Sequence, residues 1–112
     1  MIYVDHAATT RLSDRAFEAM LPWLKEEYGN PSQPYSFSRK PRKAIAEARE
    51  SIAACIGAQP EEIFFTSGGT ESDNWAIKGT ALSICREGAL LVSAFEHHAI
   101  LRACEAIEAD GW

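Results

Sequence analysis

Two short apolar segments separated by one helix-length stretch constrain the fold of this chain more than any other feature. The segment 63–66 is rich in side chains that favour strands, the segment 89–93 is apolar, and both are too short to be helices. Helical spacing of apolar residues follows each of them, which gives the order strand, helix, strand, helix. This order predicts a right-handed βαβ unit. We therefore expect an α/β fold, a partial three-layer unit with parallel strands near 62–66 and 89–93 and flanking helices.

The first 60 residues predict two further helices. Ser13 is a candidate N-cap for a helix that Gly29 ends, and Pro22 should kink this helix or disturb one of its turns. The turn signal at 29–32 begins a loop that we expect to continue to about residue 40. Pro41 suits the first position of a second helix, which Gly57 can end. No linker interrupts the chain, so we expect one domain over residues 1–112 with no internal boundary.

Composition excludes several classes of protein. With 16 acidic and 11 basic side chains the net charge is −5, which argues against nucleic acid as the main partner. The apolar runs are far shorter than the roughly 20 residues of a membrane span, and no signal peptide is visible. Cys55, Cys85 and Cys104 form no CxxC pair and are odd in number, so we expect a reducing cytoplasm. Their places on apolar helix faces predict small core residues.

A turn rich in glycine and hydroxyl side chains follows the first predicted strand. Its residues are Thr66-Ser67-Gly68-Gly69-Thr70-Glu71-Ser72. Free backbone N–H groups and the helix dipole favour an anion at the start of the next helix, and the glycines let a ligand approach the backbone. The segment is therefore a candidate phosphate cradle, although it matches neither the Walker loop nor GxGxxG. A tight turn with a capped helix and no ligand accounts for the pattern about equally well.

Glu96-His97-His98 follows the second predicted strand, at the same edge of the sheet. Ligands of open parallel sheets bind at this edge, so His97 could stack on, or hydrogen-bond to, a group held by the glycine turn. A plain helix cap is an equally good reading for His97, and a solvated helix start is the better one for His98. Neighbouring helical side chains diverge by about 100°, so we expect no metal site here.

Three other segments are uninformative when taken singly. The first is Asp5-His6-Ala7-Ala8-Thr9-Thr10, whose small residues let a ligand or another segment come close but which is otherwise only a loop. The second is the turn at 29–32. The third is the basic run 39–43, which is typical of a solvated helix start and could also contact a phosphate.

Together these segments resemble the N-terminal part of the cysteine desulfurases, pyridoxal-phosphate enzymes of the class V aminotransferase group. The resemblance covers nearly the whole chain in the family's order and spacing. The matching stretches are Tyr3-Val4-Asp5-His6-Ala7-Ala8-Thr9-Thr10, Tyr28-Gly29-Asn30-Pro31-Ser32, Phe64-Phe65-Thr66-Ser67-Gly68-Gly69-Thr70-Glu71-Ser72-Asp73-Asn74, and Glu96-His97 with Ala99-Ile100-Leu101.

The resemblance implies a role for each matched residue. Gly69 and Thr70 would hold the phosphate of pyridoxal phosphate, and His97 would stack on its ring and take part in acid–base steps. His6, Ala7 and Asn30 would lie in the substrate region. The family fold is a large α/β domain with a smaller domain, and it works as a homodimer. The implied reaction converts L-cysteine to L-alanine and leaves an enzyme-bound persulfide for a sulfur acceptor protein, as in iron–sulfur cluster assembly.

The chain also departs from the family. Ser38-Arg39 stands where the family often has Gly-Arg. The family's Schiff-base lysine and persulfide cysteine lie beyond the matched region, and Lys78 fits a solvated helix lysine better than a replacement. Since the cofactor works as an imine on a lysine, we expect an incomplete domain that is inactive by itself. Two alternatives remain: another class V enzyme, such as a selenocysteine lyase or an aminotransferase, and a non-catalytic dimerisation or binding module.

Overall fold

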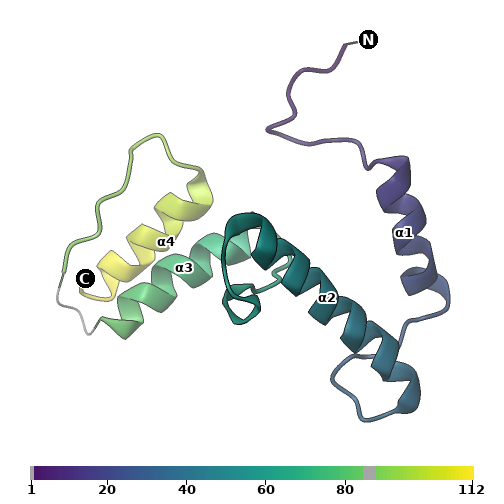
Figure 1. The fold of residues 1–112 in the computed structure, drawn as a ribbon. Coiled ribbons are helices and arrows are strands. Elements are labelled where there is room, and N and C mark those ends of the chain that lie inside the picture. The colour runs from purple at the N-terminus through teal and green to yellow at the C-terminus, as the bar shows by residue number, and fades with distance from the viewer. Residues whose placement is uncertain (1, 85–87) are drawn as a thin grey trace. The chain divides into compact units, whose positions relative to one another are not determined.

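The computed structural model describes residues 2–84 and 88–112, and the chain divides into two compact units, Met1–Phe64 and Phe65–Trp112 (Figure 1). Each unit is built from helices. The first unit contains α1 (Asp14–Lys25), η1 (Ser36–Ser38), α2 (Arg39–Ile56) and η2 (Pro60–Glu62). The second unit contains α3 (Gly69–Ser83) and α4 (His98–Ala109). No helix in the described part of the chain combines the length and apolar character needed to cross a membrane.

The prediction of an α/β fold with parallel strands near 62–66 and 89–93 is wrong for this structure, since no strand occurs among the described residues. The backbone at Ile63 is extended, with φ −98° and ψ 121°, but extended geometry alone does not make a strand. A strand exists through hydrogen bonds to a neighbouring strand, and these two segments do not pair. The first segment is divided between the two units at Phe64 and Phe65, so it belongs wholly to neither.

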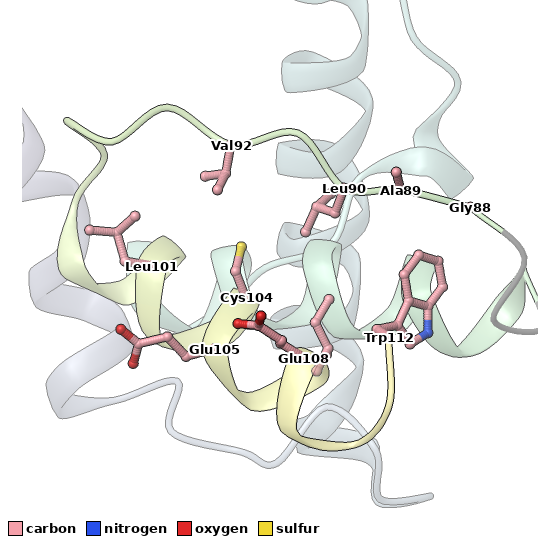
Figure 2. A pocket seen from close by; sticks show the side chains of 10 residues that line it. Gly88, Ala89, Leu90, Val92, Leu101, Cys104, Glu105, Glu108 and Trp112 are labelled. Atoms are coloured by element: carbon pink, nitrogen blue, oxygen red, sulfur yellow. The ribbon is translucent and has the colours of Figure 1, made fainter.

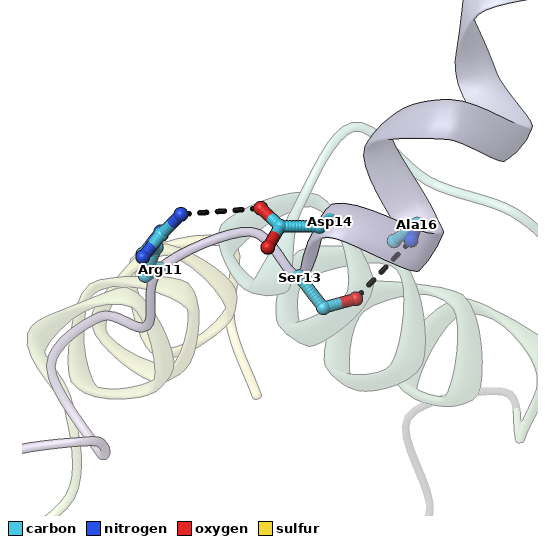
Figure 3. A network of polar contacts seen from close by, with 4 residues as sticks. All are labelled: Arg11, Ser13, Asp14 and Ala16. Atoms are coloured by element: carbon cyan, nitrogen blue, oxygen red, sulfur yellow. Dashed lines mark hydrogen bonds and ion pairs between the residues drawn. The ribbon is translucent and has the colours of Figure 1, made fainter.

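The predicted cap of α1 is confirmed. The Ser13 hydroxyl accepts a hydrogen bond from the Ala16 N–H at 3.2 Å, and Arg11 forms an ion pair with Asp14 at 3.1 Å (Figure 3). The helix continues through Pro22 and ends at Lys25, four residues before Gly29. Proline lacks only the N–H that would donate one turn back, to the Glu18 carbonyl, so the helix continues past Pro22, whose own carbonyl accepts from the cap N–H of Glu26.

The loop between α1 and α2 begins earlier than expected, after Lys25, and ends close to residue 40 as predicted. A turn of 3₁₀ helix at 36–38 leads directly into α2, which begins at Arg39, two residues before Pro41. Gly57 ends this helix as predicted, with φ +70° and its N–H donating to the Ala53 carbonyl. The left-handed conformation explains why glycine stands there.

In the second unit, α3 and α4 pack along each other and run in the same direction, so both helices begin at the same end of the pair (Figure 1). The buried residues of the two helices are Ala81, Ala99, Ala103 and Ile107, of which three are alanines. Small residues let the two backbones approach closely. The extended segment 88–93 passes over α4 and leaves a cavity of about 500 Å³ beneath it, lined by apolar residues that include Leu90, Val92 and Trp112 (Figure 2).

The cysteines differ from the expectation of core residues. Cys55 is exposed on α2, and Cys104 is half-buried where it lines the cavity under the 88–93 segment. The prediction is therefore wrong for Cys55, because the apolar face of α2 is only thinly covered in the first unit. Cys85 lies outside the described residues.

Candidate functional site

The glycine turn before α3 presents an open helix start. Gly68 occupies the N-cap position and supplies no side-chain hydrogen bond to the first turn. A Cβ atom added at Gly68 or Gly69 would meet no atom within 4 Å, so internal packing does not require glycine at either position. The first N–H groups of α3, at Gly69 and Thr70, have no acceptor within the helix, and the open space beside the two glycines lets a ligand approach the backbone. This is the arrangement that a phosphate group needs.

Hydrogen bonds within the turn fix its shape. The Glu71 carboxylate accepts from the Ser67 N–H at 2.6 Å and from the Ser67 hydroxyl at 2.7 Å. The hydroxyls of Thr66 and Ser72 lie 2.7 Å apart, which ties the start of the turn to the first turn of the helix. A shallow hollow beside the turn is lined by Ser67, Thr70, Glu71, Asn74 and Trp75. The turn is thus set in place before any ligand binds.

The pKa of Glu71 is lowered from its ordinary value, first by the hydrogen bond from the Ser67 N–H and then by the one from the Ser67 hydroxyl. Because the folded pKa lies below the unfolded one, these bonds stabilise the turn above about pH 4.5 and are lost as the pH falls through the folded pKa.

We therefore expect the Ser67 amide resonance to shift upfield as acid breaks its bond to Glu71. An NMR titration from pH 7 to pH 2 measures this, and Glu71→Gln should abolish the titration. An unshifted Ser67 amide in the native chain would contradict the geometry.

His97 is the N-cap of α4, and its Nδ1 atom accepts a hydrogen bond from the Ala99 N–H at 3.2 Å. In the neutral ring the proton must then lie on Nε2, which is the atom available as a donor to a ligand. The cap predicted as one of the two readings is confirmed. The cap does not exclude contact between His97 and a ligand at the glycine turn, because capping uses only one of the two ring nitrogens.

The divergence expected between His97 and His98 is wrong. Their ring centroids lie 4.0 Å apart with the planes tilted by 35°. The reason is that His97 stands before the helix, with ψ 142°, so the 100° spacing of helical side chains does not apply to it. No group of three metal-ligating side chains occurs in residues 2–84 and 88–112.

The structure brings Gly69, Thr70 and His97 to the same end of one unit. Gly69 opens α3 and His97 caps α4, and these two helices begin side by side (Figure 1). The sequence argument placed them together at the edge of a sheet. In the structure, the parallel packing of α3 and α4 brings these residues to one end of the unit instead.

The predicted substrate-region residues belong to the first unit and are held by local contacts. His6 lies edge-on to Tyr3, with ring centroids 5.3 Å apart, and Ala7 is exposed in a turn closed by the Ala8 N–H on the Asp5 carbonyl. Asn30 accepts from the Ser32 N–H through its side-chain oxygen at 2.9 Å.

Ser38, where the chain departs from the family, is fully buried. Its hydroxyl has no hydrogen-bond partner among the described residues. A buried hydroxyl left without a hydrogen-bond partner costs about 1–3 kcal/mol, so Ser38 is a locally unfavourable point at the start of α2.

Sequence reasoning missed Arg42, which it grouped with a solvated basic run. The guanidinium donates to the carbonyls of Pro31 and Gln33 at 2.9 and 2.8 Å. The available signal was the placing of basic residues at 39, 40, 42 and 43, where the dipole of α2 disfavours positive charge. Such a conflict between charge and position indicates that the side chains have other partners.

Comparison with known proteins places the whole chain in one family. The family described as Aminotransferase class-V matches residues 2–111. A cysteine desulfurase IscS of Dictyoglomus turgidum is 52% identical over 99% of this chain, and a putative cysteine desulfurase IscS 1 of Bacillus subtilis is 51% identical over 99%. A solved structure described as SspA in complex with cysteine is 40% identical over 98% of the chain, with a TM-score of 0.90.

The chain spans only 28% and 30% of the length of these two relatives and 32% of the solved chain. The residues matched to the family, 2–111, include the glycine turn and the His97 cap. The identity is high and the backbone agrees closely with a solved relative. The chain belongs to the class V aminotransferase family.

Proposed function

We propose that this chain forms the phosphate and ring-face part of the active site of a pyridoxal-phosphate-dependent cysteine desulfurase. The observation that carries the proposal is the open start of α3 at Gly69 and Thr70, at the same end of the unit as His97. Two relatives about half identical to the chain are described as a cysteine desulfurase and a putative cysteine desulfurase, and the SspA structure is described as a complex with cysteine. These names support cysteine as the substrate.

Each residue has a task that its geometry allows. The N–H groups of Gly69 and Thr70, with the Thr70 hydroxyl, bind the phosphate, and the dipole of α3 favours its negative charge. His97 is oriented by the Ala99 N–H on Nδ1 and offers the ring face and Nε2–H to the cofactor ring and the substrate. When bound, the cofactor withdraws electrons from the substrate's α-carbon. His6, Ala7 and Asn30 lie in the substrate region.

The proposal extends to the working form of the enzyme. A homodimer in the cytoplasm converts L-cysteine to L-alanine and passes persulfide sulfur to an acceptor protein for iron–sulfur cluster assembly. The Schiff-base lysine and the persulfide cysteine come from polypeptide outside the 112 residues. The chain assayed alone with pyridoxal phosphate and cysteine is therefore expected to release no alanine. Alanine release that survives Lys78→Ala would contradict this part of the proposal.

A chimera tests the function itself. The matching segment of the Dictyoglomus turgidum desulfurase is replaced by these 112 residues, and alanine formation from cysteine is measured with pyridoxal phosphate. We expect activity within about tenfold of the unaltered enzyme, because half of the residues in the segment are already identical. Thr70→Val removes the hydroxyl at constant shape and should weaken cofactor binding. A correctly folded chimera that binds the cofactor but does not release alanine would refute the desulfurase assignment.

A further inference from the structure

Residues 29–38, the larger part of the segment between α1 and α2 and here called the Asn30 loop, are held by contacts near both ends. At its start Gly29 is buried against Phe37, so closely that no Cβ atom would fit. Just outside the loop, Lys40 forms an ion pair and hydrogen bond with Glu27. These contacts hold the loop near its two ends. They do not fix the conformation of residues 30–33 between them.

Within the loop, the Gln33 N–H donates to the Asn30 carbonyl at 3.1 Å and closes a turn, and Arg42 attaches this turn to α2. From the first turn of α2 its Nε–H donates to the Pro31 carbonyl at 2.9 Å, and an Nη–H donates to the Gln33 carbonyl at 2.8 Å. The two carbonyls flank Ser32, whose N–H donates to the Asn30 side-chain oxygen at 2.9 Å. The planar guanidinium thus holds both sides of the turn that Asn30 closes, in a geometry that the single ammonium of lysine does not reproduce.

The position of Arg42 argues that these bonds matter. α2 has no acidic residue in its first turn, and the helix dipole disfavours the positive charges found there. Three of those charges have partners elsewhere: Lys40 on Glu27, Arg42 on the two carbonyls, and Lys43 on Glu47 one turn along. Of these three side chains, Arg42 is the one whose hydrogen-bond partners, the Pro31 and Gln33 carbonyls, lie in a segment that the proposed function places in the substrate region. A local rule broken in this way is typical of residues kept for function.

We propose that Arg42 is a positioning residue that orients Asn30 toward the substrate. This inference rests on the proposed function for its catalytic meaning. With its oxygen held by Ser32, Asn30 can offer its NH₂ group to a ligand, and Arg42 keeps that group in one direction. Loss of the guanidinium leaves the loop attached at both ends but lets Asn30 rotate.

The positioning step is tested on the 112-residue chain without any activity. NMR couplings measure whether the Asn30 side chain occupies one rotamer, and hydrogen exchange measures protection of the Ser32 amide. We expect Arg42→Ala to average the rotamer and to speed Ser32 exchange by at least tenfold, with partial recovery in Arg42→Lys. Lys43→Ala, its neighbour on α2, should change neither. A single Asn30 rotamer and unchanged Ser32 protection in Arg42→Ala would overturn the proposal.

The catalytic step is tested in the chimera with the desulfurase. We expect Arg42→Ala to lower kcat/KM about tenfold, and Arg42→Ala combined with Asn30→Ala to be no worse than Asn30→Ala alone. Additive losses would show that Arg42 does not act through Asn30. An inactive chimera would count against the proposed function, while the NMR result on the chain would still decide whether Arg42 orients Asn30.

Discussion

Replacing His97 with asparagine in the chimera is expected to abolish most desulfurase activity while leaving α4 intact. Asparagine can cap a helix as His97 does through the Ala99 N–H, but it has no ring to stack on the cofactor and no Nε2–H to place. Removing a group that works in proton transfer lowers rates by about 10²–10⁴-fold. The measurement is kcat/KM for alanine formation, with helicity followed by circular dichroism.

Two further substitutions separate the capping role of His97 from the ring role. His97→Ala should lose activity to the same extent and also destabilise α4 by about 1 kcal/mol, because the first-turn N–H loses its acceptor. His98→Ala changes the adjacent ring and leaves the cap in place. We expect it to retain most of the activity. Full activity in His97→Asn would show that the cap is the whole function of this side chain.

Replacing Gly29 with alanine is expected to displace the Asn30 loop and destabilise the first unit by roughly 1–3 kcal/mol, the usual cost of overpacking. The added Cβ atom would lie 2.7 Å from Phe37 Cδ2 and 2.9 Å from the Phe37 carbonyl oxygen. The ring could turn aside, but the carbonyl belongs to the 3₁₀ turn that begins α2, so the backbone must move. Thermal unfolding of the chain measures the loss.

Gly79→Ala is the matched control for Gly29→Ala. Gly79 lies inside α3, and its added Cβ atom would meet only Trp75 Cδ1 at an ordinary 3.5 Å. Alanine in a helix interior is about 0.5–1 kcal/mol more favourable than glycine, so this variant should be more stable. The change from glycine to alanine is thus expected to lower the stability at position 29 and to raise it at position 79. An unchanged melting temperature in Gly29→Ala would show that the loop can yield without cost.

Local signals in the sequence predicted the helices well. Ser13 caps α1, Gly57 ends α2 and His97 caps α4, because each of these features depends on residues only a few positions apart. The glycine turn before α3 was also found, since its open N–H groups follow from Gly68 and Gly69 alone. The two strands predicted near 62–66 and 89–93 do not occur among the described residues. A strand requires hydrogen bonds to a partner strand, which a local sequence pattern does not supply.

By itself the sequence determined the residue types of the candidate site: a helix start rich in glycine and hydroxyl side chains at Gly69 and Thr70, and a histidine at the start of the next helix, His97. Only the tertiary structure decided what these groups lie beside. Parallel packing of α3 and α4 through buried alanines brings the two helix starts together. The reach of Arg42 to the Pro31 and Gln33 carbonyls fixes the Asn30 loop. The helix packing and the Arg42 hydrogen bonds both join residues that are not close neighbours in the sequence. Whether such residues meet depends on the path of the folded chain and not on residue type alone.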